Sequence, residues 1–407
     1  MQTQLSPEFK DTPEGREAEA ILRKCVHCGF CTATCPTYQL FGDELDGPRG
    51  RIYLIKQVLE GETPTEKTQL HLDRCLTCRN CESTCPSGVQ YGHLVDIGRH
   101  IVEERVPRPA AQRALRWALK EGLPSPLFAP AMKLGQAVRG LLPPALKAKV
   151  PAARPAGSWP TRPHARKVLM LAGCVQPAMA PNINSATARV LDAAGIQAVI
   201  PPAAGCCGAV KFHLNDQAGG RDQMRANIDA WWPSVEGGQV EAIVMNASGC
   251  GVTVKEYGHL LQHDPAYAAK AARISELTKD LSELLPDLVP ALKDKVKVPE
   301  GVLAYHPPCT LQHGQKLRGG VEQHLGALGF AVRVAASESH LCCGSAGTYS
   351  VLQPDTAQAL RDRKLGHLVE LQPTAIVSAN IGCITHLQGG TGTPVRHWVE
   401  VLDAALA

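Results

Sequence analysis

The sequence of 407 residues predicts a multidomain protein, in which a small α-helical domain is followed by a duplicated α/β cysteine-rich domain. Three observations support this. Two short cysteine runs near the N-terminus share one spacing, a basic and proline-rich stretch follows them, and the eight remaining cysteines mark two long segments that align with each other. We expect the parts to cover residues 1–104, 105–166, 167–290 and 291–407.

The two cysteine runs carry the strongest signal. Each reads C-x2-C-x2-C-x3-C-P, and the runs end at Pro36 and Pro86. This spacing is typical of segments that wrap a [4Fe–4S] cluster, and in two-cluster ferredoxins the fourth cysteine of a run ligates the other cluster. We therefore expect a helical ferredoxin domain with two clusters. The first is assigned to Cys25, Cys28, Cys31 and Cys85, and the second to Cys75, Cys78, Cys81 and Cys35.

Zinc or disulfides are the alternatives to clusters. Zinc ribbons use pairs of cysteines, and disulfides need an oxidising compartment that nothing in this chain indicates. Helical patterns over 17–24, 49–61 and 66–74 surround the runs. In so small a domain we expect metal ligation, and not apolar burial, to hold the chain together. His27 is interpreted as a neighbour that tunes a cluster, and Arg49 and Arg51 either face cluster charge or lie on the surface.

Composition and the N-terminus suggest where the protein resides. The chain is 44% hydrophobic and 20% charged with a net charge of +4, which is ordinary for a globular protein. The first 20 residues lack the apolar core of a secretory signal, and no apolar run approaches the roughly 18 residues of a membrane span. We expect a cytoplasmic protein that contacts the inner membrane only peripherally, and we expect no nucleic-acid partner.

A basic segment separates the two halves of the chain. Residues 105–167 contain thirteen Lys or Arg, one acid and eleven prolines. Within this segment, 110–120 and 128–142 have the pattern of short basic amphipathic helices, which lie against anionic lipid or an acidic partner. A solvated basic linker is the alternative, and both interpretations stay open.

The C-terminal half is an internal repeat. An apolar strand at 168–171 leads to Cys174, and one at 302–305 leads to Cys309. Each unit then predicts helix, strand, helix and strand, which favours two α/β lobes with approximate twofold symmetry. Loops at the carboxyl ends of such strands gather in one crevice, where we expect the cysteines. The matching landmarks are Cys206-Cys207-Gly208 with Cys342-Cys343-Gly344, and Cys250 with Cys383.

The C…CCG…C pattern resembles the cysteine-rich domain of heterodisulfide reductases and of flavoprotein-linked dehydrogenase subunits. A two-cluster domain followed by two such domains resembles the iron–sulfur subunits of glycolate oxidase. The resemblance covers nearly the whole chain, and residues 46–53, 74–81 and 341–348 carry it most clearly.

The repeat departs from the heterodisulfide reductase pattern in one respect. Those domains end in C-x2-C and offer five thiolates, whereas here Thr253 and His386 stand at the last position. Either an additional iron–sulfur or metal centre lies in one or both units, or the thiols are simply reduced. We expect His306, His313 and His340 to be hydrogen-bonded neighbours rather than ligands. The candidate ligands are Cys309, Cys342, Cys343, Cys383 and His386 in the second unit, and Cys174, Cys206, Cys207 and Cys250 in the first.

Adjacent clusters carry single electrons, whereas oxidation of an organic substrate needs a two-electron acceptor such as a flavin. The stretch at 389–392 lacks the third glycine of a dinucleotide fingerprint, and we find no catalytic residues for substrate chemistry. The resemblance implies an oxidoreductase complex in which FAD-binding glycolate dehydrogenase subunits convert glycolate to glyoxylate. This chain would then pass electrons to a quinone-level acceptor at the membrane. The alternatives are a heterodisulfide reductase-like catalytic subunit, a cluster-stabilised scaffold, or the equivalent subunit for lactate or anaerobic glycerol-3-phosphate.

Overall fold

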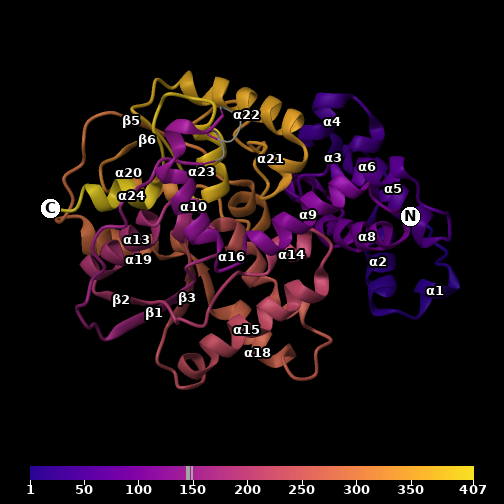
Figure 1. The fold of residues 1–407 in the computed structure, drawn as a ribbon, viewed down its shortest axis with the longest axis horizontal. Coiled ribbons are helices and arrows are strands. Elements are labelled where there is room, and N and C mark those ends of the chain that lie inside the picture. The colour runs from indigo at the N-terminus through magenta and orange to yellow at the C-terminus, as the bar shows by residue number, and fades with distance from the viewer. Residues whose placement is uncertain (144–146, 148–149) are drawn as a thin grey trace.

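The computed structural model describes residues 1–143, 147 and 150–407. Figure 1 shows the helical N-terminal part at one end of the long axis and two α/β lobes at the other. The predicted fold class is confirmed. Among the described residues, no helix is both long and apolar enough to cross a bilayer.

The N-terminal part is entirely helical. Thr12 caps its second helix by accepting from the backbone of Gly15, and Thr65 and Thr68 form a capping box before the sixth. The elements are α1 (Pro7–Lys10), α2 (Pro13–Lys24), α3 (Phe30–Ala33), α4 (Pro36–Phe41), η1 (Glu44–Asp46), α5 (Pro48–Leu59), α6 (Glu66–Asp73), α7 (Asn80–Thr84) and α8 (Tyr91–Arg105).

Helices α2, α5, α6 and α8 enclose an apolar core. Leu22, Ile55, Leu59 and Leu94 are completely buried there, beside Cys25, Cys75 and Cys81. The expectation that metal ligation holds this part together without apolar burial is therefore wrong. Each buried aliphatic side chain contributes about 1.5–3 kcal/mol, so the helices have a core of their own.

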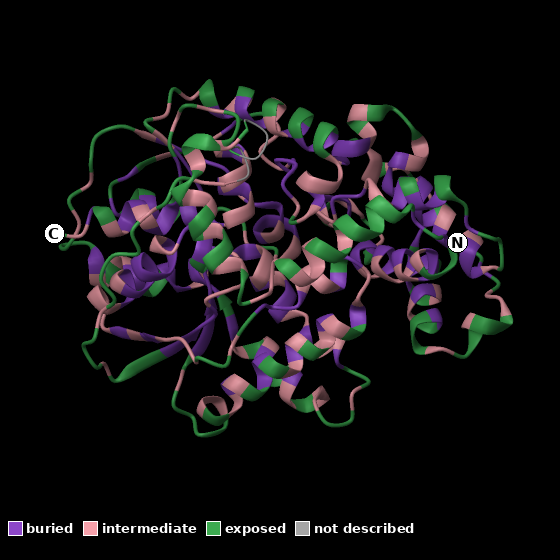
Figure 2. Ribbon diagram, viewed as in Figure 1, coloured by how far each residue is buried: buried purple, intermediate pink, exposed green. Residues whose placement is uncertain are grey.

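The basic segment forms α9 (Ala110–Gly122), α10 (Phe128–Ala137) and η2 (Arg139–Leu141), close to the expected helices. Helix α9 has no buried residue, and its exposed face is visible in Figure 2. Much of the positive charge is paired within the chain, which the sequence did not indicate. Arg108 and Arg116 bind Asp73, Lys120 binds Asp216, and Arg154 binds Glu400.

The first lobe contains a four-stranded parallel sheet in the order β2-β1-β3-β4. On β1, Val168 faces α13 and α19, whereas Leu169 packs with α15 and α18, so helices cover both faces. The strands are β1 (Arg166–Met170), β2 (Ile196–Val199), β3 (Ala242–Met245) and β4 (Thr278–Asp280). The helices are α12 (Gln176–Met179), α13 (Asn182–Ala193), α14 (Ala209–His213), α15 (Gln217–Glu236), α16 (Ser248–Lys255), α17 (Tyr257–Leu260), α18 (Ala268–Leu277), η3 (Leu281–Leu284) and α19 (Leu285–Leu292).

The second lobe repeats this topology, with a parallel sheet in the order β6-β5-β7-β8. The duplication is confirmed, and each lobe adds a fourth strand that the sequence did not predict. The strands are β5 (Val302–Tyr305), β6 (Ala331–Val334), β7 (Ala375–Ser378) and β8 (Val395–His397). The helices are η4 (Thr310–Gly314), α20 (Gly320–Ala327), α21 (Tyr349–Leu352), α22 (Pro354–Val369), α23 (Ile381–Gln388) and α24 (Trp398–Ala404).

The two lobes share one hydrophobic core, which runs from α13 and α19 into the sheet of the second lobe. The backbone N–H of Ser248 donates to the carbonyl of Ala379 at 3.0 Å, where the cysteine-bearing ends of the two sheets meet. Arg189 on α13 also pairs with Asp403 on α24 at 2.6 Å. The lobes therefore bring their carboxyl-end loops together along one seam.

Candidate metal centres

The two N-terminal cysteine runs fold alike. After the first cysteine of each run, the second and fourth residues adopt positive φ: His27 (55°) and Gly29 (86°), and Thr77 (50°) and Arg79 (57°). A short helix follows, α3 in one run and α7 in the other, and the fourth cysteine returns to extended backbone. Left-handed residues between cysteines turn the chain back sharply, so that nearby thiols face a common space.

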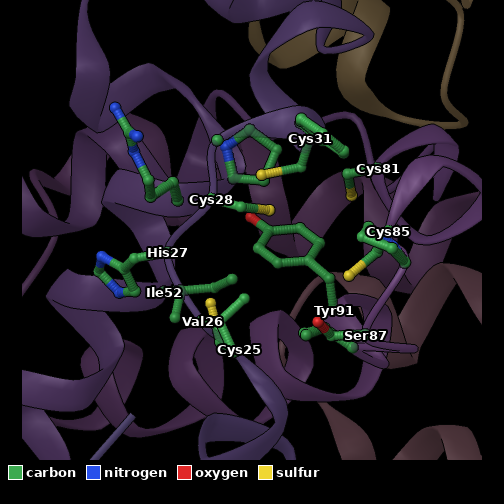
Figure 3. Close-up of a pocket in the computed structure, with 16 residues that line it drawn as sticks. Cys25, Val26, His27, Cys28, Cys31, Ile52, Cys81, Cys85, Ser87 and Tyr91 are labelled. Carbon is green, nitrogen blue, oxygen red and sulfur yellow. The ribbon is translucent and has the colours of Figure 1, made fainter.

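A first cavity lies inside the first run. Figure 3 shows the sulfur atoms of Cys25, Cys28, Cys31 and Cys85 turned toward one space beside the ring of Tyr91. The structure therefore brings together the four residues assigned to the first cluster. Three come from the first run and one from the second, and Cys81 of the second run also lines this cavity.

A second cavity lies next to the first. Cys75, Cys78 and Cys81 line it together with Cys35 of the first run, which are the four residues assigned to the second cluster. Cys81 and Tyr91 line both cavities and so form a shared wall. The fourth cysteines thus cross between the runs.

The two cavities differ in their access to solvent. At the first, Cys28 is exposed, and the neighbouring Val26 and Phe30 are 68% and 60% exposed. At the second, Cys35, Cys75 and Cys81 are buried. The exposed residues beside the first cavity therefore place its edge at the surface, whereas most cysteines at the second are buried.

Crowding and burial raise the thiol pKa values. Burial, followed by the nearby charge of Cys25, raises the pKa of Cys31 to about 11. Burial likewise raises the pKa of Cys81 well above its ordinary value, with Cys78 the next largest cause. Several thiolates in one small space repel one another unless a cation lies between them. This donor set fits a metal–sulfur cluster, because metal binding deprotonates the thiols.

Arg51 places a buried positive charge beside the second cavity. Its guanidinium donates to the carbonyl of His71 at 2.7 Å and to the hydroxyl of Thr37 at 3.1 Å. Burial lowers its pKa, but Tyr91 and the cysteines Cys75 and Cys35 outweigh this, and the pKa rises overall. A surface position for Arg51 is therefore wrong.

Arg49 lies near the surface by contrast. It pairs with Glu44, with Nε 2.5 Å from Oε1, at the rim of the first cavity. Around the second cavity, polar groups also reach the sulfur atoms: the Tyr91 hydroxyl and the Thr77 amide donate to Cys75 Sγ at 3.6 and 3.4 Å. Such bonds tune an iron–sulfur potential.

In the first lobe, the cysteines gather at the carboxyl end of the sheet as predicted. Cys206 lies close enough to Cys174 and Cys207, and Cys207 close enough to Cys250, for these thiols to shift one another's pKa. Gly208 has φ 94°, which confirms that the paired cysteines need a glycine turn. Protein groups hold this loop: Tyr257 donates to the carbonyl of Cys207 at 2.9 Å.

In the second lobe, the cysteines form a fully buried chain of contacts. Cys309 and Cys342 have their sulfur atoms 3.8 Å apart, and Cys343 contacts both Cys342 and Cys383. Gly344 has φ 89°, matching the first lobe.

One of the second-lobe histidines differs from expectation. His386 directs Nε2 to the carbonyl of Ala357 at 3.0 Å. His313 contacts Ser83 and the carbonyl of His340, as expected of a polar neighbour. The expectation is wrong for His306, whose ring nitrogens have no hydrogen-bond partner among the described residues. The sequence signal that could have singled out His306 is its position directly after strand β5 and three residues before Cys309.

The second lobe adjoins the second cavity. Cys78 packs against the buried group that contains Cys309 and Cys342. Tyr349 donates to the carbonyl of Arg74 at 3.1 Å, and Asn80 donates to the carbonyl of His340 at 3.3 Å. The first cavity, the second cavity and the second-lobe cysteines therefore follow one another in a row.

The fold and these cysteine sites define an iron–sulfur protein. Residues 21–89 match the model of the 4Fe-4S dicluster domain, and residues 168–255 and 303–388 match that of the cysteine-rich domain. The prediction of an iron–sulfur domain followed by two cysteine-rich domains is confirmed.

Comparison with known relatives shows which family of iron–sulfur proteins the chain belongs to. It is 56% identical to the glycolate oxidase iron–sulfur subunit of Escherichia coli, over 100% of this chain and 99% of that protein. It is 32% identical to the probable glycolate oxidase iron–sulfur subunit of Bacillus subtilis, over 95% and 92% of the two chains. Lactate utilization protein A of Geobacillus kaustophilus is 27% identical over 58% of this chain and 99% of its own length. The chain belongs to the family of glycolate oxidase iron–sulfur subunits.

Proposed function

We propose that this chain is the electron-transfer subunit of an oxidoreductase complex that oxidises glycolate. The observation that carries the proposal is the pair of adjacent cavities, each lined by cysteines of both runs, with Cys81 in the wall they share. When bound, two [4Fe–4S] clusters supply one-electron transfer. The proposed ligand sets are the eight cysteines assigned above, and the proposed domain limits remain 1–104, 105–166, 167–290 and 291–407, although α19 runs across the last of these limits.

Substrate chemistry belongs to a partner in this proposal. Oxidation of a 2-hydroxy acid to a 2-oxo acid releases two electrons and two protons, which an FAD-binding subunit can accept together. The names of the full-length relatives support glycolate as the substrate, and that of the shorter relative supports lactate as the next candidate. Transfer to this chain then proceeds one electron at a time.

The exposed edge of the first cavity is the proposed point of exchange with the flavoprotein. Val26 and Phe30 form an apolar rim beside the exposed Cys28, which suits a transient contact between proteins. Cys35, Cys75 and Cys81 at the second cavity are buried, and Cys78 packs against the cysteines of the second lobe, so that electrons leave toward that lobe. Arg51 favours the reduced, more negative state there.

The proposed acceptor is a quinone at the cytoplasmic face of the inner membrane. Exposed apolar side chains on and after the two basic-segment helices support peripheral binding: Trp117 is 64% exposed, Leu127 73%, Leu134 67% and Leu141 87%. Because several basic residues of this segment are paired within the chain, apolar insertion is the larger contribution. Trp117→Ser with Leu134→Ser should reduce binding to anionic vesicles, whereas Val369→Ser, 43% exposed on α22, should not.

The direct test uses cluster ligands in the complete complex. Cys28→Ser and Cys78→Ser should abolish electron flow from glycolate to an external acceptor and leave flavin reduction in the partner intact. Ser350→Ala on the short helix α21 is the control and should retain turnover. A complex that keeps full turnover with both cysteine substitutions would refute the proposal.

A further inference from the structure

The second lobe contains a buried histidine whose environment is not satisfied by protein groups. His306 follows the central strand β5, and its backbone is fixed to the next strand by donation to the carbonyl of Val377 at 2.8 Å. The residue is 1% exposed, and neither ring nitrogen has a hydrogen-bond partner among the described residues. A buried imidazole without a partner is costly, and such groups call for a ligand.

Two thiols lie within reach of this ring. One ring nitrogen of His306 and the sulfur atoms of Cys343 and Cys383 all lie within 4.8 Å of one another. All three residues are buried, and Asn380 directs its amide to Cys383 Sγ at 3.6 Å. Cys342 and Cys309 extend the same group of sulfur atoms. Imidazole and thiolate together suit zinc or the iron of an iron–sulfur centre.

A buried cation provides a second, independent observation. Lys364 is 2% exposed, and its Nζ donates to the carbonyl of Glu338. It forms no ion pair with a carboxylate in the part of the chain that the structure describes, while the Glu338 carboxylate pairs with Arg363. The groups whose negative charge would act most on Lys364 are Cys343 and Cys342, followed by Glu338 and Cys309. An isolated buried ammonium is unfavourable, whereas metal-bound thiolates would balance it.

The first lobe lacks both features, which makes it an internal comparison. In the alignment set by Cys174 and Cys309, Leu171 stands where His306 stands. The backbone carbonyls that pack against Gly208 in the first lobe and against Gly344 in the second give another alignment of the two lobes. In this alignment, Asn227 of the first lobe corresponds to Lys364 of the second. Asn227 is neutral and bonds to the carbonyl of Cys206 at 2.7 Å. Protein groups therefore satisfy this loop, although it keeps all four cysteines.

We infer that the second lobe holds a metal centre in which His306 supplies an imidazole ligand beside the thiolates of Cys343 and Cys383, and that the first lobe holds none. The inference deepens the proposed function, on which it rests, because the centre would lie next to the second cavity. Lys364 would balance its charge, and His306 would take the place of the fifth cysteine that this chain lacks.

The test measures iron, zinc and acid-labile sulfide per chain in full-length protein isolated without oxygen. Wild-type protein should contain more metal than the two four-iron clusters hold. His306→Leu and Cys343→Ser should both lose that excess. Cys207→Ser, the equivalent change in the first lobe, and His313→Gln, a buried histidine with partnered nitrogens, should both retain it.

His306→Cys guards against a variant that fails to fold, since it restores a donor atom. It should retain the excess metal, and any nitrogen coupling in the pulsed EPR spectrum of a paramagnetic centre should disappear. Excess iron and excess zinc both support the site and are distinguished by the analysis. The inference is overturned if His306→Leu keeps the excess metal, or if Cys207→Ser loses as much as Cys343→Ser. EPR signals of the two four-iron clusters separate the outcomes: their absence defeats the proposed function, whereas their presence without further metal defeats only this inference.

Discussion

Arg79 in the second cysteine run donates to both carboxylate oxygens of Glu256 on the first lobe, with Nη2 2.9 Å from Oε2. Both side chains are mostly buried, and burial favours neither charge alone. Glu256→Gln should therefore destabilise the contact between the cluster domain and the first lobe by about 2 kcal/mol or more. Differential scanning calorimetry should show a lower melting temperature or a separate transition. Glu276→Gln, whose partner Arg273 lies on the surface, is the matched control and should change little.

The same contact should depend on pH. Burial works to lower the pKa of His93, but hydrogen bonds with Glu17 and Glu256 outweigh it and raise the pKa to about 9. Burial raises the pKa of Glu17, but its partners His259 and His93 outweigh this and lower it to about 2. Burial also raises the pKa of Glu256, but its partners His93 and Arg79 outweigh this and lower it to about 2. The His93 contribution is complete below pH 6.5 and is lost as the pH rises through 9. The carboxylate contribution is complete above pH 4.5 and is lost as the pH falls toward 2.

Stability of this contact should therefore be greatest between about pH 4.5 and 6.5. After correction for the base-catalysed rise of intrinsic amide exchange, the protection of α2 and α16 should fall from pH 7 to pH 9 in wild-type protein. In His93→Gln this loss of protection should be absent. An equal loss of protection in both proteins would show that His93 does not hold the interface.

Arg51 should set the potential of the second cluster. Arg51→Met removes a buried charge that the sulfur atoms of Cys35 and Cys75 face, so the reduced cluster loses stabilisation and its potential should fall. Folding should also suffer by about 1–3 kcal/mol, because Asp46 loses one of its buried partners but keeps Arg74 at 2.7 Å. Redox titration followed by EPR measures the shift.

Two control variants test whether the charge of Arg51 causes this shift in potential. Arg51→Lys should restore most of the potential, since it keeps the charge. Arg49→Met should change the potential of the second cluster little, because Arg49 pairs with Glu44 near the surface. A larger shift of this potential in Arg49→Met than in Arg51→Met would contradict the conclusion that the charge of Arg51 acts on the second cluster.

The left-handed turn at Thr77 should tolerate glycine and reject proline. Thr77 has φ 50°, a conformation that costs a β-branched residue about 1–2 kcal/mol and costs glycine almost nothing. Thr77→Gly should therefore retain iron. Thr77→Pro requires φ near −65° and should lose the second cluster, as measured by its EPR signal. Retention of that signal in the proline variant would mean that this turn does not shape the second cavity.

Spacing and repeats in the sequence predict the architecture well, because both are local signals. The cysteine runs indicate which residues line each cavity, and the aligned strands indicate the duplicated sheets. Burial against distant segments leaves no local signal. The burial of Arg51, the pairing of the basic segment and the isolation of His306 all depend on side chains that are remote in sequence. The fourth strands, only three residues long, are too short to show a pattern.

The central claim is that the fourth cysteine of each run binds the cluster of the other run, and substitution of these two cysteines tests it most directly. Iron and acid-labile sulfide should be measured in anaerobically prepared wild-type protein, Cys85→Ser and Cys35→Ser, together with the EPR spectra of the reduced proteins. Wild-type protein should hold at least eight irons, the number in two [4Fe–4S] clusters. Cys85→Ser should alter the same signal as Cys28→Ser, and Cys35→Ser the same signal as Cys78→Ser. Iron-free protein that still supports glycolate oxidation at the full rate would contradict the account.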